Sequence, residues 1–131
     1  MLVLDHVSIT VSDLNLARPF YDAIMAALGV PKVYDELDAI GYGARCDAAI
    51  DAHSYFSVLR SPTAHTDQRR HWCFKASSRA QVDAFHRAGL ACGGFNGGVP
   101  GLRSHYHPHY YAAFLIDPGG NRIEAVCHRP D

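Results

Sequence analysis

The sequence predicts an α+β fold in which one β-α-β-β-β unit occurs twice within a single domain, residues 1–131. One observation behind this prediction is an internal duplication: a strand that contains a histidine precedes a helical stretch in each half, with His6 in the first and His71 in the second. Another is the strand, tight turn and strand expected over Ala112–Val126. Neither unit alone has enough area for a stable core, so the two are expected to pack together.

The first unit, residues 1–60, begins with a strand that has one apolar and one polar face, and His6 lies on the polar face. A helix is expected to follow from about Leu16, because Pro19 is unfavourable well inside a helix, and Gly29 is placed to end it. Three further strands are expected after this helix, at Lys32–Tyr34, Ala39–Ala44 and Ser54–Leu59.

A polar connector, residues 61–70, leads to the second unit, residues 71–131. The first strand of this unit also has an apolar face, and His71 projects from the opposite face. Ser78 and Gln81 have the spacing of a capping box, which predicts the start of a second helix. The glycine-rich segment after that helix, residues 92–104, does not match a phosphate-binding loop and is expected to be a flexible loop.

The last strand contains Glu124, a carboxylate among apolar residues. Burial of such a carboxylate is costly unless a positive group or a metal ion balances its charge, and exposure to solvent or an arginine partner is the ordinary alternative. His6 and His71 also project from the polar faces of separate strands. Two imidazoles and one carboxylate placed in this way could form a facial triad with open coordination positions.

Composition argues against several function classes. The net charge is −1 and charges of both signs are scattered, so neither nucleic-acid binding nor membrane binding is indicated. No apolar run approaches the length of a membrane span, and the N-terminus lacks the features of a secretion signal, so a cytoplasmic protein is expected. The four cysteines form no C-x-x-C pair and are expected to be buried free thiols.

This arrangement resembles the vicinal oxygen chelate superfamily, which includes glyoxalase I, bleomycin-resistance proteins, fosfomycin-resistance thiol transferases and type I extradiol dioxygenases. The resemblance covers essentially the whole chain, and it rests on Leu4–Val7, Phe20-Tyr21 with Leu28-Gly29, His71, and the run Asp117–Glu124. It implies two βαβββ modules whose curved mixed sheets surround a cleft, a small-molecule substrate and a homodimer.

By the same resemblance, His6, His71 and Glu124 match the ligands of a divalent metal ion, such as iron(II), manganese, zinc or nickel. Glyoxalase I has a fourth ligand in its first half, and the equivalent position by sequence offset is Leu59. The strand around Leu59 contains no carboxylate. The site is therefore more similar to the two-histidine, one-glutamate pattern of the dioxygenases and the fosfomycin enzymes.

The C-terminal part also resembles the extradiol dioxygenase signature, in which a histidine precedes an apolar-tyrosine pair. His107 has the expected spacing, but Ala113-Phe114 replaces the pair, so Tyr110 or Tyr111 would have to supply the missing hydroxyl. His107, Tyr110 and Tyr111 are thus the candidates for moving a proton. For the run that contains His105, His107 and His109, a surface loop and a second metal site are the alternative interpretations.

These observations favour a metal-dependent enzyme that binds two neighbouring oxygens of a small substrate, either a dioxygenase-like oxidoreductase or a glyoxalase-like lyase or isomerase. A metal-free protein that sequesters a ligand, of the bleomycin-resistance type, is an alternative, although a pure binder has no need of the three ligands. A fosfomycin-type thiol transferase is a third hypothesis. It requires an anion-binding pocket, for which Lys75, Arg103 and Arg122 are the candidates.

Overall fold

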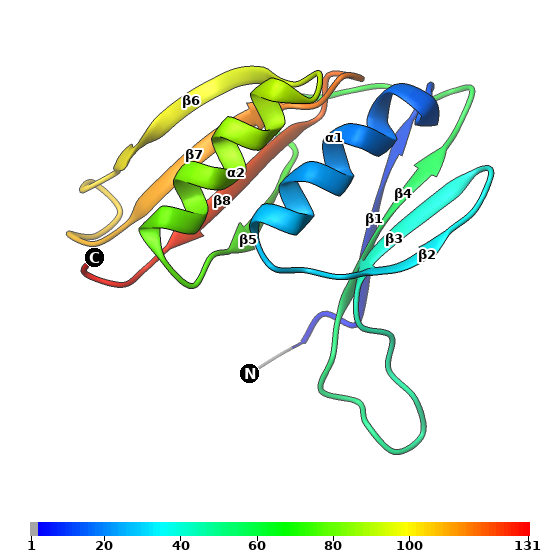
Figure 1. The fold of residues 1–131 in the computed structure, drawn as a ribbon, viewed down its shortest axis with the longest axis horizontal. Helices are drawn as coiled ribbons and strands as arrows, with labels where there is room; N and C mark the ends of the chain where they lie inside the picture. The colour runs from blue at the N-terminus through cyan, green and yellow to red at the C-terminus, as the bar shows by residue number, and fades with distance from the viewer. Residues whose placement is uncertain (1–2) are drawn as a thin grey trace.

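The computed structural model describes residues 3–131, which form two four-stranded sheets and two helices (Figure 1). The elements of the first half are β1 (His6–Val11), α1 (Leu14–Ala27), β2 (Lys32–Asp35), β3 (Ala39–Gly43) and β4 (Tyr55–Arg60). Those of the second half are β5 (His71–Lys75), α2 (Arg79–Ala91), β6 (Phe95–Leu102), β7 (Tyr111–Ile116) and β8 (Arg122–Cys127). The predicted fold class, with the β-α-β-β-β unit present twice, is confirmed.

Each unit forms a mixed sheet of its own, with strand order β1-β4-β3-β2 in the first and β5-β8-β7-β6 in the second. The opening strand of each unit pairs in parallel with the last strand of that unit, and the other pairs are antiparallel. Within residues 3–131, β1 and β5 are therefore edge strands. An edge strand presents a row of backbone groups that another strand can pair with.

The two helices pack against each other and cover one face of the two sheets (Figure 1). Phe20 and Tyr21 of α1 and Phe85 of α2 are fully buried in this layer. Phe56 of β4 meets Phe74 of β5 edge to face, with ring centroids 5.1 Å apart, so aromatic contacts join the units. Burial of each large apolar side chain contributes about 2–3 kcal/mol relative to exposure. The helices leave the opposite face of each sheet uncovered (Figure 1).

The turn between β7 and β8 also joins the two units. The fully buried carboxylate of Asp117 accepts hydrogen bonds of 2.8 Å from the backbone N–H groups of Gly119 and Asn121 within the turn. It also accepts a hydrogen bond of 2.5 Å from the hydroxyl of Tyr21 in α1. The side chain of Asn121 donates to the backbone oxygen of Thr10 in β1. The turn thereby aligns the second sheet with the first unit.

Helix α1 begins at Leu14, earlier than the expected start near Leu16. Asp13 caps the helix, because its side chain accepts a hydrogen bond of 3.2 Å from the backbone N–H of Leu16. Leu14 and Ala17 are buried against the core. The cap and this burial outweigh the one backbone hydrogen bond that Pro19 cannot donate.

The glycine-rich segment 92–104 is not a flexible loop, since most of it forms β6 against β7. The register shifts between Asn96 and Gly98 and again between Gly98 and Gly101. A Cβ atom on Gly98 would lie 3.0 Å from the ring of Phe114, so glycine allows the strand to approach this ring closely. The strand was not predicted because its sequence lacks alternating apolar side chains. Backbone hydrogen bonds to β7 hold it in place.

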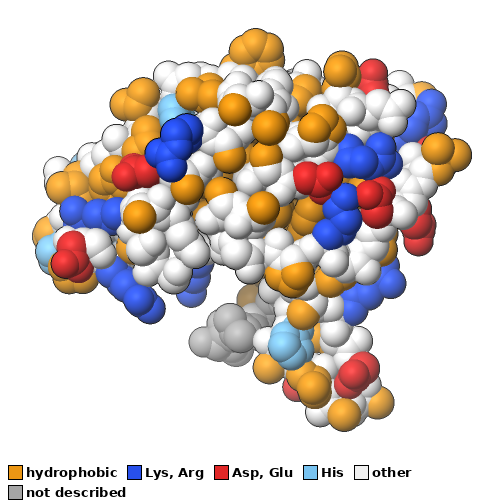
Figure 2. Space-filling model, in the orientation of Figure 1, with side chains coloured by type: hydrophobic (Ala, Val, Ile, Leu, Met, Phe, Trp, Pro, Cys, Tyr) orange, Lys and Arg blue, Asp and Glu red, His pale blue; other side chains and the backbone are white. Residues whose placement is uncertain are grey.

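Charged side chains of both signs lie interspersed over α1 and β2 (Figure 2). The Lys32 ammonium contacts the carboxylates of Asp22 and Asp35 at 2.8 and 2.7 Å, for example. No helix within residues 3–131 has the length and apolar character needed to cross a membrane. All four cysteines are free thiols, but only Cys127 is fully buried, because the others lie in loops, at a helix end or on an edge strand.

Candidate functional site

The side chains of β8 alternate between the two faces of its sheet. Ile123 and Ala125 belong to the core beneath the helices. Glu124 and Val126 therefore lie on the opposite face, together with Phe114, the antiparallel partner of Glu124 on β7. This face carries the candidate site residues of the second unit.

Glu124 is only 3% exposed although it carries a carboxylate. Its Oε1 lies 3.0 Å from Nε2 of His71, and its Oε2 accepts a hydrogen bond of 2.6 Å from the hydroxyl of Tyr110. These partners meet Glu124 because β8 lies between β5, which His71 begins, and β7, which directly follows Tyr110. The interpretations of Glu124 as exposed or paired with an arginine are wrong.

The charge of Glu124 also affects Cys73, its parallel partner on β5. Desolvation, followed by the negative charge of Glu124, raises the pKa of the Cys73 thiol to about 12. Desolvation and the hydrogen bond to Glu124 raise the pKa of Tyr110 as well. Both groups therefore keep their protons at neutral pH, and Tyr110 acts as a hydrogen-bond donor to the carboxylate.

His6 does not join this cluster within one chain. Its Nδ1 lies 2.7 Å from the carboxylate of Asp5, and its ring stacks on Tyr55 with centroids 4.9 Å apart. No group of three or more His, Cys, Asp or Glu side chains within residues 3–131 is placed to hold a metal ion. A single chain thus brings together His71 and Glu124, two of the three predicted ligands.

The donor groups that are present fit a divalent metal ion. Ligand atoms about 2.1 Å from such an ion, in neighbouring positions at right angles, are about 3.0 Å apart. His71 Nε2 and Glu124 Oε1 are also 3.0 Å apart, and in the metal-free chain this distance is that of a hydrogen bond between them. Asp5 holds Nδ1 of His6, an arrangement that orients a histidine so that Nε2 can bind a metal.

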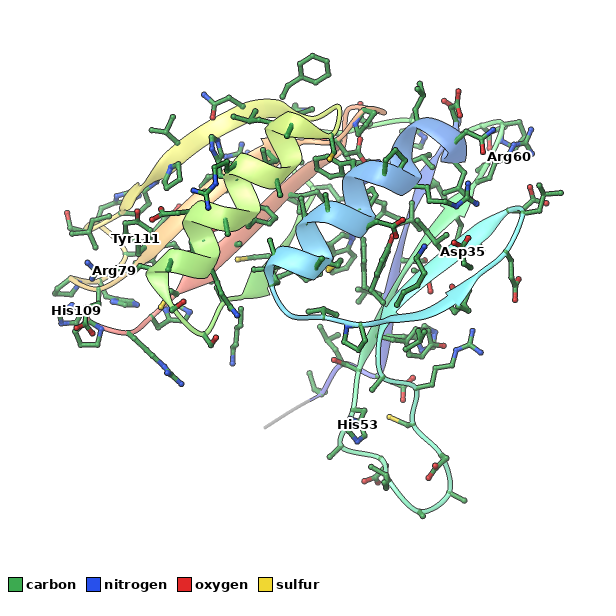
Figure 3. All side chains as sticks on the ribbon, viewed as in Figure 1. Asp35, His53, Arg60, Arg79, His109 and Tyr111 are labelled. Carbon is green, nitrogen blue, oxygen red and sulfur yellow. The ribbon has the colours of Figure 1, made fainter. Side chains whose placement is uncertain are left out.

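Tyr110 and Tyr111 point to opposite faces of the second sheet, as consecutive residues of an extended chain do. The hydroxyl of Tyr111 donates a hydrogen bond of 2.6 Å to Asp83 of α2, and the Arg79 guanidinium lies over the Tyr111 ring (Figure 3). Tyr111 is therefore directed towards the helix and away from Glu124. Of the two tyrosines, only Tyr110 is placed to act on the site.

His107 is separated from Glu124 by the side chain of Tyr110. Its Nδ1 accepts a hydrogen bond from the backbone N–H of His109, so in the neutral ring Nε2 carries the proton and donates to Nδ1 of His128 at 2.9 Å. The rings of His107 and Tyr110 meet edge to face, with centroids 5.6 Å apart. His107 therefore contacts Tyr110 but not Glu124.

Solved structures of other proteins share this fold and part of this sequence. The chain is 32% identical to a glyoxalase/bleomycin resistance protein from Albidiferax ferrireducens, with a TM-score of 0.77. The match covers 96% of this chain and 98% of that one. This chain belongs to the glyoxalase/bleomycin resistance protein family. The resemblance to the vicinal oxygen chelate superfamily is thereby confirmed.

Other members of the superfamily share the fold at lower identity. A glyoxalase/bleomycin resistance protein/dioxygenase family enzyme from Burkholderia phytofirmans is 16% identical over 98% of this chain and 100% of its own, with a TM-score of 0.69. A lactoylglutathione lyase from Agrobacterium tumefaciens is 18% identical over 97% and 94%, with a TM-score of 0.61. No family model and no curated protein matches the sequence.

The strand pairing shows that the residue of the first unit equivalent to Glu124 differs from the one expected from the sequence offset. Cys73, two residues after His71, pairs with Glu124, and Ser8, two residues after His6, pairs with Ser57. The equivalent position is therefore Ser57 and not Leu59, because the two units differ in the lengths of their connections. Ser57 is buried and accepts a hydrogen bond from the hydroxyl of Tyr34. Ser57 is not a carboxylate either, so the first unit still lacks a fourth ligand at the equivalent position.

Two further groups, one on the face of Glu124 and one beside His6, were not singled out from the sequence. His128 continues the alternation of Glu124 and Val126 to the same face of the sheet, a signal that was present in the sequence. Arg45 lies over the rings of Tyr34 and Tyr55, with its Cζ 4.4 and 5.4 Å from their centroids. This cation follows β3 in a loop, where no periodic pattern indicates its position.

Proposed function

We propose that this protein is a metal-dependent enzyme acting on a small substrate with two neighbouring oxygens, and that it functions as a homodimer. The observation that carries the proposal is the environment of Glu124, a buried carboxylate with one oxygen facing His71 Nε2 and the other held by Tyr110. Burial of a carboxylate is costly, and a divalent cation between Glu124 and His71 would balance its charge.

The edge strands support completion of the site by a second copy of the chain. His6 begins β1 and His71 begins β5, and neither strand has a partner on its outer side within residues 3–131. If β1 of one copy lies beside β5 of the other, both edges are covered and His6 approaches His71 and Glu124. Each dimer would then contain two equivalent metal sites.

A cavity of about 710 Å³ beside these edges supports the same arrangement. Val7 of β1 and Trp72 and Phe74 of β5 line it and are only partly buried in one chain. Apolar side chains at a strand edge favour contact with another protein surface. The dimer would cover them.

In the proposed site, a bound metal ion supplies a Lewis acid that stabilises negative charge on the substrate oxygens. His71 and Glu124 hold their side of the ion, and Tyr110 fixes the direction of the Glu124 carboxylate through its hydrogen bond. Asp5 orients His6 through Nδ1. We assign proton transfer to His107 with His128, because imidazoles as a class exchange protons near neutral pH and this pair lies beside Tyr110.

The proposal is tested by metal analysis of untagged protein after incubation with iron(II), manganese, zinc or nickel. Glu124→Gln keeps the shape of the side chain and removes its charge, and Glu36→Gln on the exposed β2–β3 connection is the matched control. We expect roughly one metal ion per chain in the wild type and in Glu36→Gln, and strongly reduced occupancy in Glu124→Gln.

Thermal melting provides an independent measurement of the same effect. Added metal should raise the melting temperature of the wild type and of Glu36→Gln, because it binds the native state, and should raise that of Glu124→Gln much less. Equal shifts in all three proteins would remove the basis for a metal site at Glu124. The metal-free, ligand-sequestering function would then be the better description.

A further inference from the structure

Arg122 is a half-buried arginine beside the candidate metal site, and it has a donor without an acceptor among the described residues. It begins β8, two residues before Glu124 on the same face, and it pairs in register with His71 of β5. Its Nε is shielded from solvent and has no hydrogen-bond partner in the described part of the chain. None of the ion pairs found within residues 3–131 involves Arg122.

This placement costs folding free energy, because a buried polar group without a partner loses its hydration and gains no hydrogen bond. Partial compensation comes from the ring of Phe114, which lies 4.4 Å from the guanidinium carbon of Arg122. A guanidinium carries its N–H donors in the plane of the group, so a contact with an aromatic ring does not by itself satisfy them. A shielded donor that lacks an acceptor is unfavourable for folding, and next to a candidate active site such a donor is expected to bind a ligand.

A second arginine approaches the same ring. Arg103 has its Cζ 5.7 Å from the Phe114 centroid, and its Nη1 and Nη2 donate hydrogen bonds of 2.9 Å to the backbone oxygens of Gly101 and Val99. These bonds use part of its donors and fix the guanidinium in place. Two positive charges therefore flank one aromatic ring.

This cationic patch is continuous with the candidate metal site. Phe114 pairs in register with Glu124, and its ring centroid lies 6.0 Å from that of His71. Two residues along a strand span about 6.6 Å, which separates the positions of Arg122 and Glu124 on β8. One six-membered ring can bridge an anionic group at Arg122 and a pair of oxygens near Glu124.

We propose that Arg122, assisted by Arg103 and Phe114, binds a carboxylate of the substrate, so that the substrate is a small carboxylic acid that also carries two neighbouring oxygens. The planar fork of a guanidinium matches a carboxylate through two parallel hydrogen bonds, which explains why an arginine occupies this position. The role of the neighbouring oxygens rests on the proposed metal-dependent function, whereas the carboxylate site stands on the arginines alone.

The test compares two probes of the same size and shape, 3,4-dihydroxybenzoate and 3,4-dihydroxybenzamide, of which only the first carries a charged carboxylate. Binding is measured by calorimetry with the metal-loaded full-length protein. We expect the wild type to bind the benzoate at least about tenfold more tightly than the benzamide. In Arg122→Met, which keeps much of the packing on Phe114, this preference should fall below about twofold, whereas the exposed control Arg87→Met should retain it.

The same titrations after treatment with chelator separate this proposal from the proposed metal-dependent function. A protein that takes up no metal when metal is supplied, but that shows an Arg122-dependent preference for the benzoate with and without chelator, would leave the carboxylate site standing and reject the metal site. Normal metal binding without a preference for the benzoate, or with a preference that Arg122→Met does not change, would overturn the carboxylate site.

A second variant covers the case in which Arg122→Met does not fold. Arg122→Lys keeps the positive charge and loses the planar fork, so the preference for the benzoate is expected to fall by about threefold or more. An undiminished preference in Arg122→Lys would overturn the assignment of a carboxylate held by two hydrogen bonds.

Discussion

The carboxylate of Glu124 has three neighbours that determine what it can bind. His71 faces one oxygen, Tyr110 donates to the other, and Cys73 lies opposite in the neighbouring strand. Alternation in the sequence placed His71 and Glu124 on polar faces of their strands, so the pair was predictable. The hydrogen bond from Tyr110 to Glu124 was not predictable, because it depends on the path of the chain just before β7 begins.

At this scale, Tyr110→Phe tests how the carboxylate is held. Loss of the hydroxyl leaves Oε2 of Glu124 without its donor, so we expect the free energy of unfolding of the metal-free protein to fall by about 1–3 kcal/mol. Metal affinity should fall by about tenfold, because a residue that orients a ligand is lost. Denaturant unfolding and metal titration measure the two effects.

Tyr106→Phe is the control for this experiment, because the Tyr106 side chain is exposed and no hydrogen bond of its hydroxyl is found within the described residues. It should change neither quantity. If Tyr110→Phe matches this control in both measurements, the hydrogen bond to Glu124 has no role in stability or metal binding.

Among the elements, β6 illustrates where sequence patterns fail. Its residues are mostly glycine and exposed apolar side chains, so neither helical nor strand periodicity is visible. Pairing with β7 nevertheless makes it a strand, and two register shifts bring it close to Phe114 and Arg103. By contrast, β1, β5 and β8 have clear alternation, and the sequence reveals the Ser78 cap of α2, although the Asp13 cap of α1 was missed.

Gly98→Ala tests the close approach of β6 to the site. The added Cβ would lie 3.0 Å from the Phe114 ring and 3.1 Å from Nη2 of Arg103, so these groups must shift. We expect a loss of about 1–2 kcal/mol in the free energy of unfolding, as is usual for overpacking. Denaturant unfolding measures this loss.

Gly101→Ala is the matched control, because the added Cβ would not meet the Phe114 ring and its one near contact, Nη1 of Arg103, is 3.3 Å away. It is expected to change stability by less than about 0.5 kcal/mol. A Gly98→Ala protein as stable as this control would show that β6 can move away from Phe114 without cost.

Considered as a whole, the molecule is two similar units with different chemistry on their open faces. His6, Tyr55 and Arg45 lie on or beside the first sheet, and His71 and Glu124 lie on the second. The sequence revealed the duplication but not the separation of the ligands, because the way two units pack depends on contacts such as Phe56 with Phe74 that no local pattern encodes.

Mixing two inactive variants tests the proposed shared site. In a dimer of one His6→Ala chain and one His71→Ala chain, one site lacks both histidines and the other has both. Each variant alone should lose most of its metal binding, and the mixture, after unfolding and refolding together, should recover up to about a quarter of the wild-type capacity by random pairing. Metal titration of the refolded mixture measures the recovery.

His65→Ala, on the exposed connector between the units, serves as the control for histidine removal. Sedimentation should show dimers for the wild type and all three variants, because none of these substitutions changes Val7, Trp72 or Phe74, the apolar side chains that the dimer would cover. If the wild type is monomeric at high micromolar concentration, or if the mixture recovers nothing, the shared site is ruled out.

The hydroxyl of Ser57 occupies in the first unit the place that Glu124 occupies in the second. Each of these residues pairs with the residue two places after the first-strand histidine, but one carries a carboxylate and the other a hydroxyl that accepts a hydrogen bond from Tyr34. The two units thus share a backbone register and differ in the chemistry that the register displays. A glutamate at Ser57 would bring a carboxylate to the strand that pairs with β1 while the backbone register of the first sheet stayed the same.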